Sequence, residues 1–132
     1  MNEEEIESWK RQQSRFCMQF DGASKNNLGK AGAGGIIYDP SGKKIVTYEW
    51  GLGQIPNNKA EAYNLLLGTR IIRKIGIQNP IILGDSTIII ETMTRAKNPS
   101  NTYMRRIIKR VRRNLESSCT VTFKHIMRCH NQ

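Results

Sequence analysis

The chain has 132 residues, 38% of them hydrophobic and 24% charged, which fits one globular domain that closes a core of its own. Its longest apolar runs, such as "TIII" and "NLLL", are too short to cross a bilayer, so we expect no association with membranes. The formal net charge is +10, and so large a positive excess suggests a polyanionic partner, most simply a nucleic acid.

The number and spacing of the cysteines indicate a reducing environment. Cys17, Cys119 and Cys129 are odd in number and show no CxxC spacing, so we expect free thiols. The opening residues are acidic and polar, which is not typical of a secretory signal. Together these features predict an intracellular, reducing compartment, either the cytoplasm or the nucleus.

The first half of the chain predicts three strands. Residues 1–14 are expected to form a tail or a short helix, and residues 15–132 a single domain. "RFCMQFD" alternates as a strand does, "NNLGKAGAGG" is expected to form a glycine-rich turn, and "AGGIIYD" and "KKIVTYEW" predict two further strands around the turn "DPSG". Three strands in sequence with short connections predict an antiparallel meander.

The second half changes to helical spacing. Apolar residues recur every three or four positions over 58–75, where Gly76 ends the predicted helix. A short buried strand is expected at 79–85, helices at 86–97 and 102–116, and a last strand at 119–126. The order βββ-α-β-α-α-β predicts an α+β fold with a mixed five-stranded sheet and helices packed on it.

Three acidic residues are predicted at or near the ends of three elements. Asp21 ends the first strand, Glu61 lies near the start of the long helix, and Asp85 directly follows the central strand. Converging carboxylates repel one another unless cations lie among them, and hard oxygen ligands suit Mg²⁺ or Mn²⁺. Each acid also has a simpler interpretation: a turn aspartate, a helix acid favoured by the helix dipole, and a cap formed by Asp85 and Ser86.

The helix predicted at 102–116 is strongly basic. Eight basic residues and no acid occur between Arg95 and Arg113. Five of them are candidates for contacts with nucleic acid: Arg105, Arg106, Lys109, Arg110 and Arg113. The alternative is a solvated helix face that only keeps the protein soluble.

Four blocks in this order, "FDGASKNNLGKAGAGGIIYD", "NNKAEAYNLLLGTR", "LGDSTIII" and "FKHIMRCHNQ", resemble the signature of the ribonuclease H family, in particular the domains common in plant proteins and retroelements. The resemblance implies an endonuclease that cuts the RNA strand of RNA–DNA hybrids with two metal ions held by Asp21, Glu61 and Asp85. It also implies nucleic-acid contacts at six further positions: Gly22, Ala23, Ser24, Asn57, Asn58 and Ser86. The resemblance implies that Gly22, Asn57 and Asn58 read the 2′-hydroxyl that distinguishes RNA from DNA, whereas the alternative for Ser86 is that it only shapes its loop.

Two departures from the family pattern stand out. Pro56 replaces the usual threonine, and the sequence ends at Gln132, a few residues before the position of a fourth acidic ligand and of a final helix. We therefore expect a chain truncated at its C-terminus, with impaired or lost cleavage. A homodimer through the sheet face that the missing helix would cover is a further hypothesis.

Two functions stay open at this point. The first is a metal-dependent ribonuclease, and the second is a non-catalytic module that binds RNA–DNA hybrids or other nucleic acids. All three acids are present, which favours the ribonuclease. For His125, a structural role is favoured over proton transfer.

Overall fold

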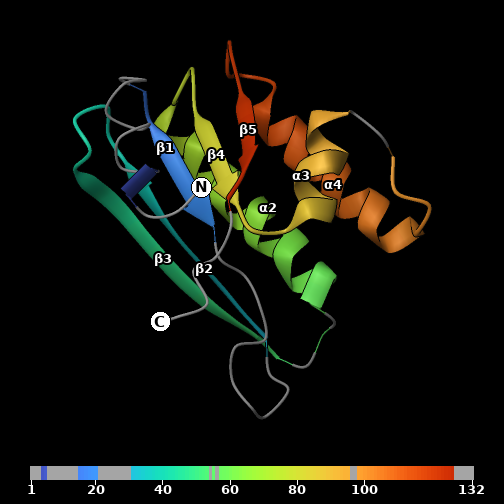
Figure 1. Cartoon of the computed structure of the whole chain (residues 1–132). Coiled ribbons are helices and arrows are strands. Elements are labelled where there is room, and N and C mark those ends of the chain that lie inside the picture. The colour runs from blue at the N-terminus through green and yellow to red at the C-terminus, as the bar shows by residue number, and fades with distance from the viewer. Residues whose placement is uncertain are drawn as a thin grey trace.

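The computed structural model describes residues 4–5, 15–20, 31–53, 55, 57–95 and 98–126, with the backbone alone at 31, 57 and 58. Eight elements follow one another in the described part of the chain (Figure 1): β1 (Cys17–Phe20), β2 (Ala31–Tyr38), β3 (Lys44–Gly53), α2 (Asn57–Ile75), β4 (Ile81–Gly84), α3 (Thr87–Thr94), α4 (Thr102–Leu115) and β5 (Thr122–His125). The predicted order βββ-α-β-α-α-β is confirmed.

The five strands form one mixed sheet in the order β3-β2-β1-β4-β5. β1 pairs with β2 and β2 with β3 in antiparallel fashion, which confirms the predicted meander. β4 pairs with β1 and with β5 in parallel fashion, and Cys17 lies opposite Ile81 in the first of these ladders. β1 is therefore central, and its two neighbours run in opposite directions.

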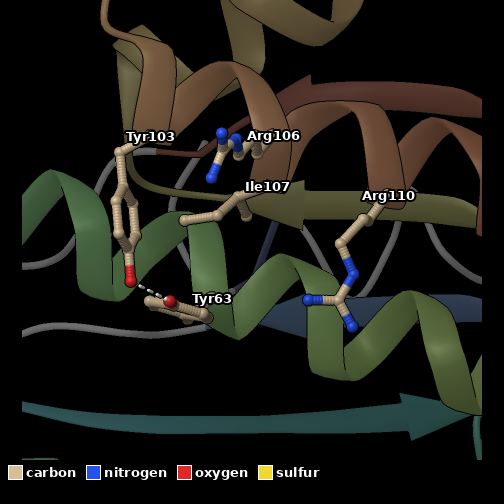
Figure 2. Close-up of a pocket in the computed structure, with 5 residues that line it drawn as sticks. All are labelled: Tyr63, Tyr103, Arg106, Ile107 and Arg110. Atoms are coloured by element: carbon tan, nitrogen blue, oxygen red, sulfur yellow. Dashed lines mark hydrogen bonds between the residues drawn. The ribbon is translucent and has the colours of Figure 1, made fainter.

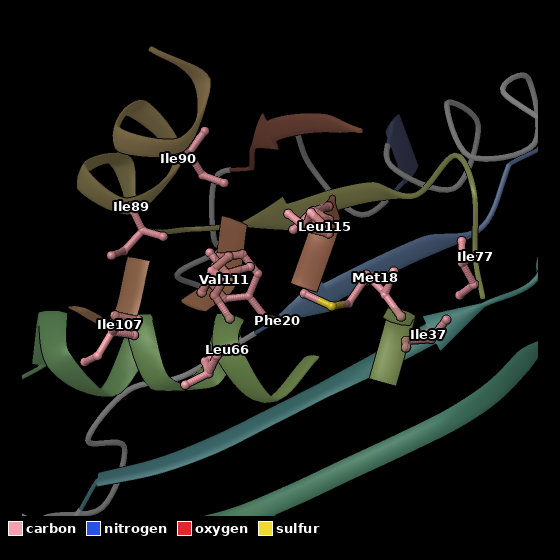
Figure 3. Packing of buried hydrophobic residues seen from close by; sticks show 14 residues of the cluster. Met18, Phe20, Ile37, Leu66, Ile77, Ile89, Ile90, Ile107, Val111 and Leu115 are labelled. Carbon is pink, nitrogen blue, oxygen red and sulfur yellow. The ribbon is translucent and has the colours of Figure 1, made fainter. Parts of the chain in front are cut away.

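The main core lies between the sheet and the three helices, which Figure 1 shows on one side of the strands. Side chains alternate along a strand, so Met18, Phe20 and Ile82 face the helices. The helices contribute the apolar stripes that their sequence predicts, for example Ile107 and Val111 of α4 (Figure 3).

The opposite sheet face is also buried at its centre. Cys17 is 1% exposed, and Ile81 and Leu83 are both 0% exposed. An open apolar face was the reason for expecting a homodimer, and these residues do not provide one. The dimer therefore has no support in the structure.

The predicted glycine-rich turn is wrong for residues 31 and 32, which belong to β2, whereas residues 33–35 lie in β2 as the strand predicted from "AGGIIYD" requires. A Cβ at Gly35 would lie 2.6 Å from Cε1 of Tyr48 on the paired strand. Gly35 therefore admits a large side chain from the neighbouring strand and does not reverse the chain. The turn predicted at "DPSG" is confirmed, because the Asp39 carboxylate accepts hydrogen bonds from the backbone amides of Ser41 at 2.9 Å and Lys43 at 3.0 Å.

The long helix α2 ends where the sequence predicts. α2 ends at Ile75, and Gly76 adopts the left-handed conformation with φ 84°. Its amide and that of Ile77 both donate to the Ile72 carbonyl, at 2.9 and 3.1 Å. This is the usual way to satisfy the last carbonyls of a helix. α3 ends at Thr94, earlier than predicted.

Candidate active site and nucleic-acid interface

The candidate site lies at the sheet edge where β1 and β4 end. Because these strands are parallel neighbours, their carboxyl ends meet at one edge, with Gln19 opposite Leu83 in the last pair of the ladder. The Phe20 ring packs so tightly over Gly84 that a Cβ there would lie 2.9 Å from Cε2. Asp85 follows Gly84 directly and is half-buried.

Asp21 follows Phe20 in the sequence, but it lies outside the described residues, as do Gly22, Ala23 and Ser24. The side chains of Asn57 and Asn58 are also not described, although their backbone forms the first turn of α2. These positions stay predictions.

Glu61 lies on the face of α2 that packs on the sheet. It is 8% exposed, and Gly68 lies two turns further along the same helix. A Cβ at Gly68 would lie 2.7 Å from the Tyr48 hydroxyl oxygen, so the helix approaches the sheet closely there. Asn64 lies between Glu61 and Gly68 on α2. Its Nδ2 donates to the Gly34 carbonyl at 2.8 Å and connects α2 to β2.

Glu61 and Asp85, the two candidate metal ligands that the structure describes, carry buried oxygens. Oε2 of Glu61 and Oδ1 of Asp85 accept no hydrogen bond within the described residues, although both residues take part in other interactions. Carboxylate oxygens are the ligands that Mg²⁺ and Mn²⁺ prefer, so these residues fit such an ion. No group of three or more His, Cys, Asp or Glu residues that could hold a metal occurs within the part of the chain described.

The turn that carries Asp85 is fixed from two sides. Ser86 caps α3, because its Oγ accepts from the Ile89 amide at 3.3 Å. His125 at the end of β5 lies with Nε2 3.0 Å from the Asp85 carbonyl oxygen and 3.2 Å from Oγ1 of Thr87. A carbonyl can only accept, so Nε2 carries a proton in the contact with Asp85. These contacts give His125 the structural role that the sequence favoured.

The basic residues of α4 divide into two groups. Arg105 donates to the carbonyls of Pro99 and Ser100, at 3.1 and 3.3 Å. Arg112 donates to Oδ1 of Asn98 at 2.9 Å and to the carbonyl of Thr92 at 3.3 Å. Both guanidinium groups thus hold the segment that leads into α4, a role that the sequence did not indicate for either.

The second group is exposed to solvent. Arg106, Lys109, Arg110 and Arg113 are all exposed, and none of them donates a hydrogen bond to a described residue. Arg106 and Arg110 line a pocket with Tyr63 and Tyr103 (Figure 2). The tyrosines were missed in the sequence, although Tyr103, Arg106 and Arg110 recur at the spacing of one helix face.

The strand order, with Asp85 directly after β4 at the edge where β1 also ends, defines a domain of the ribonuclease H-like class. A family model described as reverse transcriptase-like matches residues 19–132, and the chain belongs to this family. The resemblance to the ribonuclease H family is thereby confirmed.

Curated relatives are more distant in sequence. Ribonuclease HI of Halobacterium salinarum is 26% identical over 118 residues, which cover 89% of this chain and 59% of the relative. A bifunctional protein of Mycobacterium tuberculosis is 28% identical over 89 residues, covering 64% and 24%. This chain therefore spans less than two thirds of the length of either relative.

Solved structures show the same fold. The crystal structure of ribonuclease H1 from Halobacterium salinarum matches with a TM-score of 0.77 and 26% identity, covering 86% of each chain. The ribonuclease H domain of the Mycobacterium tuberculosis protein matches with a TM-score of 0.79 and 20% identity, covering 88% and 84%. The structure of LC11 ribonuclease H1 in complex with an RNA/DNA hybrid matches with a TM-score of 0.76 and 20% identity, covering 86% of each chain.

No helix within the described ranges is both long enough and apolar enough to span a membrane.

Proposed function

We propose that this chain is a metal-dependent endonuclease that cuts the RNA strand of RNA–DNA hybrids. The observation that carries the proposal is the parallel pairing of β1 with β4, which brings the ends of both strands to one edge. Asp85 lies there, and Asp21 directly follows Phe20 in the sequence. The relative named ribonuclease HI and the structural neighbour solved with an RNA/DNA hybrid support the same substrate.

Asp21, Glu61 and Asp85 are the residues that would hold the metal ions. Two divalent cations, when bound, supply an activated water and stabilise the leaving oxygen. The protein positions the ligands: α2 holds the buried Glu61 carboxylate against the sheet, and the Ser86 cap fixes the backbone after Asp85. A buried carboxylate with a fixed backbone loses little entropy when it binds a cation.

Recognition of the RNA strand falls to the residues around the start of α2 and after β1. Asn57 and Asn58 form the first turn of α2, where helix amides carry partial positive charge. Side-chain amides and backbone groups can both donate to and accept from a 2′-hydroxyl, which DNA lacks. We include Gly22, Ala23 and Ser24 in this surface because they directly follow Asp21.

The test is a cleavage assay on a short hybrid with a labelled RNA strand, in Mg²⁺ and separately in Mn²⁺. Glu61→Gln and Asp85→Asn keep the shape of each side chain and remove its charge, so we expect the rate to fall about 100-fold or more, equivalent to roughly 3 kcal/mol. Glu91→Gln is the matched control, because Glu91 is an exposed acid on α3.

Cleavage that survives in both site variants would refute the metal scheme. Hybrid binding measured in EDTA, together with cleavage measured in Mg²⁺ or Mn²⁺, separates the two open functions. Binding without cleavage by the unaltered chain would favour the non-catalytic module, whereas cleavage that requires the metal and both acids supports the nuclease.

A further inference from the structure

Asn64 places a polar side chain in the core next to the candidate site. It is 0% exposed and lies one turn after Glu61 on the face of α2 that packs on the sheet. Side chains three positions apart on a helix are neighbours, with Cβ atoms about 5–6 Å apart. A fully buried position usually carries an apolar side chain, so the amide of Asn64 requires an explanation.

The nitrogen of this amide connects the helix to the sheet. Nδ2 of Asn64 donates to the Gly34 carbonyl at 2.8 Å. The ladder of β1 with β2 ends at the pair of Phe20 with Gly35, and Gly34 is the next residue of β2 toward the site. The bond therefore holds the amide near the sheet edge where β1 and β4 end.

The oxygen of the same amide has no such role. Oδ1 of Asn64 is buried and accepts no hydrogen bond within the part of the chain that the structure describes. The nearby Tyr48 hydroxyl is directed at the main chain, 3.5 Å from the carbonyl oxygen of Asn64. A buried acceptor without a donor destabilises the fold, and a ligand that brings a donor removes this cost.

We propose that Asn64 is a positioning residue of the metal site, whose Oδ1 accepts a hydrogen bond from a water molecule bound to the cation at Glu61. Mg²⁺ keeps several waters when carboxylates bind it, and these waters donate to acceptors around the site. Because Nδ2 already donates to Gly34, the orientation of the amide is fixed, and the end that stays available is an acceptor. The inference rests on the proposed function, because it takes a divalent cation at Glu61 as given.

The test compares two variants that each remove a buried polar contact of α2. Asn64→Leu keeps the approximate shape of the side chain and removes both ends of the amide. Thr69→Val is the matched control, because Thr69 is 0% exposed and its Oγ1 accepts from Nδ2 of Asn114 at 3.2 Å. Thr69 lies about 12 Å further along the helix axis than Glu61, too far to contact a water on that cation.

Mn²⁺ binding to the full chain is measured without nucleic acid, from the electron paramagnetic resonance signal of the free ion. Circular dichroism at the same temperature checks that each variant is folded. We expect Asn64→Leu to weaken Mn²⁺ binding about tenfold, and Thr69→Val to keep the wild-type affinity.

A second variant separates the two ends of the amide. Asn64→Asp keeps an acceptor oxygen and removes the donor to Gly34, so its Mn²⁺ affinity should equal or exceed that of wild type. This variant decides the question if Asn64→Leu does not fold. In a crystal structure of the wild-type chain with Mg²⁺, a water bound to the ion should lie within about 3 Å of Oδ1 of Asn64.

Four results would overturn the inference. They are an unchanged Mn²⁺ affinity in Asn64→Leu, an equal loss in Thr69→Val, a loss in Asn64→Asp as large as that in Asn64→Leu, and a crystal structure in which no water on the ion reaches Oδ1. Each of these leaves the proposed function standing if the wild-type chain cleaves the hybrid in Mg²⁺ or Mn²⁺. If the wild-type chain binds neither cation and cleaves no hybrid, the proposed function itself fails, and the inference fails with it.

Discussion

Gly68→Ala tests how closely α2 packs on the sheet, and with it the placement of Glu61. In an exposed helix interior, alanine would stabilise relative to glycine by about 1 kcal/mol. Here the new Cβ would lie 2.7 Å from the Tyr48 hydroxyl oxygen and 2.8 Å from Cε of Met18. Met18 is 1% exposed and Tyr48 6%, so neither side chain can move into free space.

Overpacking of this kind costs about 1–3 kcal/mol, which exceeds the gain in helix propensity. We therefore expect Gly68→Ala to lower the free energy of unfolding by about 1 kcal/mol, and the melting temperature by about 4 °C. Urea and thermal unfolding, followed by circular dichroism, measure both quantities. Gly51→Ala is the matched control, because a Cβ at Gly51 meets nothing within 4 Å.

A double variant identifies the contact responsible. Tyr48→Phe removes the hydroxyl that the new Cβ meets, so Gly68→Ala should cost less in that background. The clash with Met18 remains, and the rescue should therefore be partial. If Gly68→Ala is as stable as the wild-type chain, the close approach of α2 to the sheet is wrong, and the placement of Glu61 with it.

Three further predictions concern a helix cap, a buried tyrosine and the cysteines. Asn101 caps α4 by accepting from two backbone amides at 2.9 and 3.1 Å, so Asn101→Ala should cost about 1 kcal/mol in thermal melts, whereas Asn101→Asp should keep the cap. Burial raises the pKa of Tyr48 above its ordinary value, so its contribution to stability is complete below about pH 10 and is lost as the pH rises through the folded-state pKa. Urea unfolding from pH 8 to 11 should therefore show wild type losing stability relative to Tyr48→Phe only at the alkaline end; a constant difference would contradict this. In a Cys129→Ser background, a thiol reagent should modify the exposed Cys119 in the native state and the buried Cys17 only on unfolding, and equal rates would contradict the burial.

The elements with strong periodicity could be predicted from the sequence. α2 and α4 carry apolar stripes at helical spacing, and Gly76 marks the end of α2 within one residue. Residues 31 and 32 were assigned to a turn although they belong to β2, and the reason for the nearby Gly35 is a tyrosine on the paired strand. Local pattern alone carries no information about a neighbour that comes later in the chain.

Some residues of the candidate site could be predicted from the sequence, and others could not. The two described acids, Glu61 and Asp85, lie on the elements that the sequence predicts for them. The difference between Arg105 and Arg106 could not be predicted, since both are basic positions on one helix. Only the fold shows that the carbonyl groups before α4 engage the first of them. The Tyr63–Tyr103 pair depends on how two helices are placed, which spacing within either helix does not determine.

The hairpin turn after Tyr38 offers a practical use. In the register of β1 with β2, Tyr38 lies opposite Cys17, the start of β1, whereas Asp85 follows β4 at the edge where β1 ends. The turn is exposed and closed by its own bonds around Asp39. A fluorophore or affinity handle attached at Ser41 would therefore lie at the end of β1 opposite to the proposed active site.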